Sequence, residues 1–325
     1  MAIQVVDLEL LRRFEQKLDP EFPERCEIPT RVLGYGEIST VLEIGQGPAA
    51  NLAYKRMSMF KTEPEAERYE ILYKEYIQAL QERVGLPVVP SAIVRLVDAD
   101  SGRIVVYIIQ EKLPAETIGH KVIHHIHRDD AERLILTVLR QIATVFDFNR
   151  RYKGRLEIGF DAQISNWAVV DFDPAVPALN EEIKLLYFDT SAPLLRKNGQ
   201  EQLNSELFLR CAPSFLAPVL RLLFLEDVLT RYYDMRQVTI DLLANFYKEQ
   251  RSDLVPVLVD AVNRFFATEI ERGGFKPVTV KEVRSYYRQD AWIWRLYLTF
   301  RKVDRALYRV LGKHYPYILP GKIKR

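Results

Sequence analysis

The sequence pattern changes near Pro114, and this change constrains the fold more than any other feature. Upstream, short runs rich in β-branched residues are separated by turn residues, with one helical stretch between them. Downstream, helical patterns dominate and only one short β-like stretch appears. A run of strands followed by a run of helices is typical of an α+β fold. We therefore predict a two-lobed α+β protein, with an N-lobe of residues 1–114 and a C-lobe of residues 115–325.

The N-lobe pattern predicts a five-stranded antiparallel sheet with one inserted helix. Residues 63–83 carry apolar side chains near helical spacing, and Thr62 with Pro64 gives a helix-start signal. Asp100-Ser101-Gly102 predicts the turn of a hairpin. A short amphipathic helix is expected over residues 4–18. The predicted strands lie within residues 29–57, which hold three of them, and at 92–97 and 103–111.

The C-lobe begins with a long candidate helix at residues 128–151. Residues 162–173 and 183–189 are β-like and are separated by the proline-rich loop 174–177, so we expect a hairpin there. From Glu201 onward the pattern is helical.

Composition excludes several functional classes. Lys plus Arg is 46 and Asp plus Glu is 44, so the net charge of +2 creates no strong field for nucleic acid. The two cysteines, Cys26 and Cys211, form neither a disulfide framework nor a zinc site, which favours a reducing compartment. The N-terminus lacks the apolar stretch of a signal peptide, and residues 215–229 are too short and too charged to span a bilayer. We expect a cytoplasmic protein with no nucleic-acid partner and no membrane span.

The first candidate site feature is Gly34-Tyr35-Gly36, between two predicted strands. Two glycines let the backbone approach phosphate oxygens and present N–H groups to them. A single G-x-G pattern is also what an ordinary hairpin turn contains, and that interpretation stays open.

The second and third features are Lys55, on a predicted strand, and Glu75, on the helix that follows. A strand lysine among small and apolar residues either extends its side chain to the surface or meets an anion in a cleft. A glutamate on the next helix is placed to pair with it, and Glu67 and Glu70 are rivals for this role.

The fourth feature combines Asp161-x4-Asn166 with Asp189, which ends the predicted return strand of the hairpin. Oxygen ligands of this kind suit Mg²⁺. Asp161 would then be left to orient or deprotonate a hydroxyl. Asp171 and Asp173 are excluded as ligands beside Asn166, because a strand that rises about 3.3 Å per residue carries them to the far end of the hairpin.

The order of these motifs resembles that of the protein-kinase-like superfamily, and the closer likeness is to its aminoglycoside phosphotransferase and choline kinase branch. The resemblance covers about residues 30–195 and implies a phosphotransferase that uses ATP and Mg²⁺. It implies phosphate contacts from Gly34, Gly36 and Ser39, and from Lys55 held by Glu75. It further implies adenine binding by the hinge backbone near Glu111 and Leu113, Asp161 as catalytic base, and Asn166 and Asp189 as metal ligands.

Two residues depart from the family pattern. Gly159 stands two residues before Asp161 where the family usually has histidine, and Ser191 stands where the third metal-loop residue is often glycine. These departures motivate an alternative, a pseudokinase that binds nucleotide or a partner without turnover. The leading hypothesis is a kinase for a small-molecule hydroxyl acceptor that the helical half would select. A protein-kinase activity is disfavoured because Ala212-Pro213-Ser214 lacks the acid of the substrate-loop motif. An interaction protein with a closed cleft is the remaining alternative.

Two further stretches carry weaker signals. His120 and His124 have the spacing of a helix-borne metal pair without an evident third ligand, so a solvated helix or loop is favoured. Residues 292–307 are basic and aromatic, which suits either a membrane-surface helix or a helix packed on the C-lobe. We expect packing through Trp292, Leu296, Phe300, Val303 and Leu307, with the basic region able to meet an acidic partner.

Overall fold

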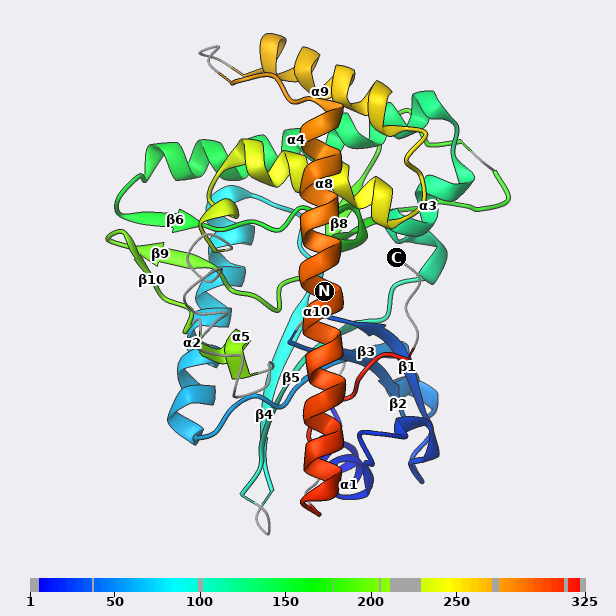
Figure 1. The fold of residues 1–325 in the computed structure, drawn as a ribbon, viewed down its shortest axis with the longest axis vertical. Coiled ribbons are helices and arrows are strands. Elements are labelled where there is room, and N and C mark those ends of the chain that lie inside the picture. Colours follow the sequence, from blue (N-terminus) through cyan, green and yellow to red (C-terminus); the bar gives the residue numbers. More distant parts are fainter. Residues whose placement is uncertain are drawn as a thin grey trace.

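Figure 1 shows a computed structural model that describes residues 6–36, 38–98, 102–176, 178–204, 206–210, 229–270, 275–312 and 315–321. Several sequence-based predictions fall outside these residues. They concern Cys211, the tripeptide 212–214, most of the apolar stretch 215–229, and Asp100 and Ser101 of the predicted turn.

The N-lobe sheet is the predicted one. All neighbouring strands are antiparallel, in the order β1-β2-β3-β5-β4. A bulge between Val32 and Gly34 interrupts the β1–β2 register. The strands are β1 (Thr30–Tyr35), β2 (Thr40–Ile44), β3 (Leu52–Met57), β4 (Ser91–Val97) and β5 (Ile104–Glu111).

Two helices cover the two faces of this sheet. The pleat sends alternate side chains to opposite faces, so Met57 and Ile108 pack with α2 (Glu63–Gln78), whereas Tyr54 and Tyr107 pack with α1 (Leu8–Lys17). β5 is buried along nearly its whole length because both faces are covered. α2 continues into a π-helical turn and ends at Gly85, whose φ of +80° suits glycine.

The C-lobe is mainly helical. The long helix α4 has the predicted bounds, and its apolar residues recur at helical spacing and are buried. The helices are α3 (Gly119–His125), α4 (Arg128–Arg151), α5 (Glu206–Arg210), α8 (Met235–Lys248), α9 (Val255–Thr268) and α10 (Val280–Val310). The short strands are β6 (Leu156–Ile158), β7 (Trp167–Val169), β8 (Leu185–Tyr187), β9 (Leu195–Lys197) and β10 (Gln200–Glu201).

The predicted hairpin is formed by β7 and β8, and it joins the lobes. Trp167 pairs with Tyr187, and Val169 with Leu185. The backbone of Tyr187 also exchanges hydrogen bonds with the N-lobe, donating to the Pro87 carbonyl at 2.8 Å and accepting from Val89 at 2.9 Å. The end of the hairpin that carries Asp189 is thereby held against the sheet.

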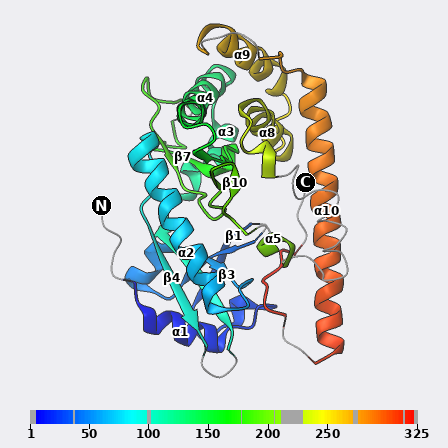
Figure 2. The same cartoon turned by 90° about the vertical axis from the view of Figure 1, so that its left-hand side faces the viewer.

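α10 begins beside α9 and runs along one side of the molecule (Figure 2). Its first half packs on α8 and α9. Beyond it, residues 315–321 return to the N-lobe, where Ile318 is buried in the same core as α1 and the Pro316 carbonyl accepts from Arg56 and Ser58. The division at residue 114 stays a prediction.

The predicted packing of α10 is wrong at three positions. Trp292, Val303 and Leu307 are 58%, 45% and 47% exposed. The helix instead buries its opposite side, where Trp294 and Arg301 lie. The Arg301 guanidinium lies 5.4 Å from the ring centroid of Tyr297 and 4.8 Å from that of Tyr317. A cation held over aromatic rings is stabilised, and this contact sets the rotation of the helix. Within the described residues, no helix is both long enough and apolar enough to cross a membrane.

Candidate active site

Lys55 projects from β3 into the space between the sheet and the β7–β8 hairpin. The residue is 5% exposed. Its Nζ donates to Asp189 Oδ1 at 3.0 Å and to the Phe188 carbonyl at 2.9 Å. Two residues 134 positions apart in sequence thus form an ion pair between the lobes.

Asp189 is held as an anion. Burial alone would raise its pKa, but the Lys55 ammonium and the Ser191 hydroxyl, which donates to Oδ1 at 2.8 Å, hold the pKa below its ordinary value. All of these donors use Oδ1. Oδ2 therefore remains as the atom through which Asp189 can reach a cation.

Asn166 and Asp161 lie next to this pair on one short loop. The Phe188 N–H donates to the Asn166 carbonyl at 3.1 Å, which places the loop beside Asp189. Asn166 Nδ2 donates to the Asp161 carbonyl at 3.2 Å, and Tyr187 donates to the same oxygen at 2.9 Å. Because the Asn166 amide nitrogen is committed to the backbone, its Oδ1 is the available ligand atom.

Sequence reasoning missed Gln163, which α8 holds in place. Its Nε2 donates to the Asp241 carboxylate at 3.2 Å, and its Oε1 accepts from Asn245 at 3.0 Å and Lys248 at 3.3 Å. Burial raises the pKa of Asp241. Both polar ends of the glutamine amide are satisfied, so α8 fixes the loop that carries Asp161. A single Gln between Asp161 and Asn166 gave no sequence signal for this contact.

Gly159 has no space for a side chain. A Cβ there would lie 2.6 Å from Leu194 Cβ and 3.0 Å from the Tyr233 ring. Its N–H donates to the Leu194 carbonyl and its carbonyl accepts from Tyr76, so its backbone cannot shift freely. The neighbouring loop is braced by Tyr187 and Asn166 on the Asp161 carbonyl, instead of by a histidine at this position.

The predicted Lys55–Glu75 pair is wrong in this structure. Glu75 accepts from Lys197 Nζ at 2.6 Å and is 42% exposed at its side chain. The rival Glu70 pairs with Arg95, and Glu67 is exposed. The rotation of α2 is set by its buried tyrosines, which turn these acids away from the cleft.

Three α2 tyrosines occupy the side that faces the cleft loops. Tyr69 donates to the Ser191 carbonyl at 2.7 Å, Tyr73 lies 3.1 Å from Thr190 Oγ1, and Tyr76 donates to the Gly159 carbonyl at 3.1 Å. They recur at helical spacing and are almost fully buried. α2 therefore holds the loop after Asp189 with phenol groups instead of a carboxylate.

The glycine-containing turn lies between β1 and β2. The Gly36 N–H donates to the Ser39 carbonyl at 2.8 Å, and a Cβ at Gly36 would lie 2.9 Å from Ser39 Oγ. Among the described residues, nothing lies within 4 Å of a Cβ built on Gly34. Ser39 itself is 8% exposed. A tight turn with an open glycine next to it is compatible with a phosphate-covering loop, and that role stays a prediction.

The hinge follows β5, which ends at Glu111. The Lys112 N–H donates a hydrogen bond to the Asn51 carbonyl. Among the described residues, neither the N–H nor the carbonyl of Leu113 has a hydrogen-bond partner, so its backbone is free to meet a ligand edge. Gln110, which sequence reasoning missed, is buried and donates to the Phe188 carbonyl at 3.1 Å.

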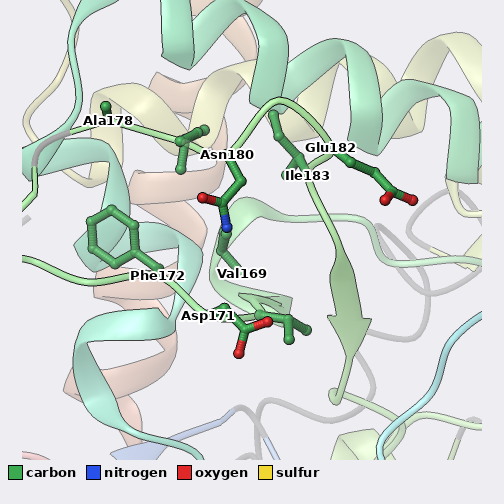
Figure 3. Close-up of a pocket in the computed structure, with 9 residues that line it drawn as sticks. Val169, Asp171, Phe172, Ala178, Asn180, Glu182 and Ile183 are labelled. Atoms are coloured by element: carbon green, nitrogen blue, oxygen red, sulfur yellow. The ribbon is translucent and has the colours of Figure 1, made fainter.

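Asp171 lies at the opposite end of the hairpin, as predicted. The β7–β8 pairing continues from the Val170 N–H to the Lys184 carbonyl, and Asp171 follows in the connecting loop with φ of +59°. Figure 3 shows Asp171 with Asn180 and Glu182 around a small recess on this side. Asp171 is exposed and serves below as a matched control.

The histidines do not assemble a metal site in the described part of the chain. No three side chains of His, Cys, Asp or Glu gather there at metal-binding distance. Burial lowers the pKa of His120, which lies on α3, and His124 is exposed.

Comparisons with known proteins give one family and several structural likenesses. A model described as a family of unknown function, DUF6206, matches residues 24–306. No curated protein sequence matches this chain.

Among solved structures, WaaP in complex with acyl carrier protein is similar at 14% identity, with a TM-score of 0.33 over 71% of this chain and 89% of that one. The GDP and kanamycin complex of APH(2")-IIia has 10% identity and a TM-score of 0.34 over 81% and 100%. The GDP complex of wild-type aminoglycoside 2'-phosphotransferase-IIIa has 9% identity and a TM-score of 0.33 over 79% and 98%. The strand order of the sheet and the meeting of Lys55 with Asp189 agree with the α+β fold expected from the sequence.

Proposed function

The chain belongs to the DUF6206 family, whose function is unknown, and we propose that it is an ATP-dependent phosphotransferase acting on a hydroxyl group of a small molecule. One observation carries this proposal. Three hydrogen bonds connect the candidate residues. Lys55 donates to Asp189, the N–H of the preceding residue Phe188 donates to the Asn166 carbonyl, and the Asn166 side chain donates to the Asp161 carbonyl. The Lys55 ammonium and the Asp189 carboxylate thus lie next to the loop that carries Asn166 and Asp161.

The residues fit a magnesium site. Asn166 Oδ1 and Asp189 Oδ2 are hard oxygen ligands, and each side chain is oriented by a hydrogen bond through its other atom. Mg²⁺ takes few protein ligands and completes its shell with waters and phosphate oxygens. When bound, it would neutralise charge on the triphosphate.

The protein groups have separate tasks in this proposal. Lys55 would bind phosphate oxygens, exchanging its contact with Asp189 for one with nucleotide. Gly34, Gly36 and Ser39 would cover the phosphates, and the backbone at Glu111 and Leu113 would meet the adenine edge. Asp161 would orient the acceptor hydroxyl and accept its proton, on a loop that Gln163 and α8 hold in place.

A nucleotide-binding pseudokinase is the second candidate. It is favoured by the direct Lys55–Asp189 pair and by the Ser191 hydroxyl, which together occupy Asp189 Oδ1. In that case the cleft would bind nucleotide without transferring phosphate.

Turnover and binding measured on the same variants separate the two candidates. ATP consumption is assayed with Mg²⁺ and a panel of alcohols, sugars and amino alcohols, and nucleotide binding is followed by thermal shift. Asp161→Asn should lower turnover by about 10²- to 10⁴-fold and leave nucleotide binding intact. Lys55→Met should weaken nucleotide binding by about 10- to 100-fold, since a charge-assisted contact is lost.

Asp171→Asn is the matched control, because it removes a carboxylate from the opposite end of the same hairpin and asparagine tolerates the positive φ. Its turnover and binding should equal those of the wild type. Nucleotide binding without turnover would select the pseudokinase. Absence of binding, or measurable turnover that is equal in the Asp161→Asn and Asp171→Asn proteins, would contradict the assigned site.

A further inference from the structure

The side of α10 that faces away from the molecule carries an apolar row. Its members include Trp292 at 58% exposure and Val310 at 84%, values far above those of the residues on the buried side. Figure 2 shows this helix along one edge of the molecule. We define the apolar row as Trp292, Val303, Leu307 and Val310, which are exposed, together with Leu296, which is half-buried.

A cationic row runs beside it. Arg288, Arg295, Lys302 and Arg309 are spaced seven residues apart and are all exposed, and Arg309 also pairs with Glu21. Since each residue advances about 100° around an α-helix, this spacing keeps the four cations nearly in line on one flank of the apolar row. We call the two rows together the outer face of α10.

The outer face belongs to an anchored helix. The opposite side is held by the buried Trp294 and by Arg301 between tyrosine rings. A capping box of Thr279 and Glu282 fixes the N-terminus of the helix. The outer face therefore cannot be buried by a simple rotation of α10, because rotation would expose the aromatic contacts that hold it.

The charge of this region is strongly positive. Residues 281–325 contain twelve Lys or Arg and three Asp or Glu, whereas the whole chain has a net charge of +2. Between Trp292 and Val310 the helix has one acid, Asp304, which is half-buried and away from the cationic row. Two copies of this face brought together would place like charges opposite each other, which disfavours self-association.

We propose that the outer face of α10 binds an anionic lipid bilayer in its interfacial plane. A row of Trp, Leu and Val flanked by Lys and Arg is the pattern by which interfacial helices insert apolar groups between headgroups while cations contact lipid phosphates. The apolar row extends over about 27 Å of helix, at 1.5 Å per residue. The protein would thus lie on the surface as a peripheral protein, with α10 parallel to it.

The test is co-sedimentation of the full chain with vesicles of phosphatidylcholine alone or mixed with phosphatidylserine. Wild-type protein should bind the anionic vesicles and not the neutral ones. The triple variant R288Q/R295Q/K302Q should lose about 100-fold in partitioning, at about fivefold for each cation. W292S/L307S should lose at least about tenfold, because the apolar insertion is removed.

Two control variants remove similar groups from other surfaces. R150Q/R151Q/K153Q lowers the charge equally near the end of α4, and I71S removes an exposed apolar side chain of α2. Both should bind anionic vesicles as the wild type does, and circular dichroism should show all variants folded.

Three results would overturn the proposal. They are failure of the wild type to bind anionic vesicles, equal loss in the control and outer-face variants, and a wild-type dimer in sedimentation equilibrium that W292S/L307S abolishes. The last result would assign the outer face to a second copy of the chain. None of them bears on the phosphotransferase proposal, which depends on the cleft.

Discussion

The buried ion pair behind the N-lobe sheet gives the sharpest prediction about stability. Arg56 follows Lys55 on β3 and therefore points to the opposite face, where its Nε and Nη2 donate to the two Glu15 carboxylate oxygens at 2.7 and 2.9 Å. The two side chains are 2% and 6% exposed. Tyr107 also donates to Glu15, and Arg56 Nη1 donates to the Pro316 carbonyl at 2.9 Å.

Removing one charge of this pair should lower the free energy of unfolding far more than removing both charges does. Glu15→Gln keeps the shape but leaves the Arg56 guanidinium buried without its counter-ion, which should lower the free energy of unfolding by about 3–5 kcal/mol. In the double variant Glu15→Leu/Arg56→Met no charge is buried. It should recover most of that loss, since well-packed apolar replacements of buried pairs are often neutral. The Pro316 carbonyl would still accept from Ser58.

Urea unfolding followed by circular dichroism measures both changes as shifts of the midpoint at a constant m-value. Exposed pairs offer a control, because Arg150→Gln breaks the Arg150–Asp147 pair, whose side chains are 58% and 41% exposed, and should change stability by at most about 1 kcal/mol. A loss of stability in Glu15→Gln no larger than in this control, or a double variant as unstable as the single one, would contradict the prediction.

The same pair predicts a pH dependence. Burial alone would raise the pKa of Glu15, but Arg56 and Tyr107 hold it below the ordinary 4.5. The stabilisation is therefore complete above about pH 4.5 and is lost as the pH falls through the lower pKa of the folded state. The wild type should lose more stability than the double variant between pH 5 and the acid limit, as urea midpoints at each pH would report.

Three further predictions concern the cleft loops. Gly159→Ala should destabilise by about 1–3 kcal/mol, because its methyl group meets Leu194 at 2.6 Å; an unchanged urea midpoint would contradict this. Tyr76→Phe should cost about 1–3 kcal/mol and lower turnover, because a buried carbonyl at Gly159 loses its donor; equal stability to the wild type would refute it. Glu75→Gln breaks only the half-exposed pair with Lys197 and should change stability by at most about 1 kcal/mol without weakening nucleotide binding; a large loss of affinity in titrations would restore Glu75 to the site.

The N-lobe sheet and the β7–β8 hairpin were predictable because their signals are local. β-Branched runs with Gly and Pro at the turns predicted all five strands, and the long helix predicted over residues 128–151 has the bounds of α4. The Asp161-x4-Asn166 spacing placed both groups on one loop. Strand geometry alone predicted that Asp189, and not Asp171, lies beside Asn166. The first strand of the hairpin carries Asp171 away from Asn166, and the second strand brings Asp189 back.

The wrong predictions concern α2 and α10, where the rotation of the helix about its axis decides which side chains are buried. The sequence of α2 offers glutamates and tyrosines on adjacent faces, and burial of three phenol rings outweighs one solvated ion pair. On α10 two aromatic faces compete, and the tyrosines that surround Arg301 come partly from residues 315–317, beyond the helix. Residues 315–317 have no periodic pattern, so their contacts with α10 cannot be inferred from the sequence of the helix.

The return of residues 315–321 to the sheet has a consequence for biosynthesis. Arg56 meets Pro316 across 260 residues, and Thr40 meets Ile318 across 278. At about 5–20 residues per second, β3 emerges from the ribosome roughly 10–50 s before this covering segment is made. During that interval the face of the sheet that carries Arg56 is incompletely covered, so these contacts can form only after translation has passed residue 318.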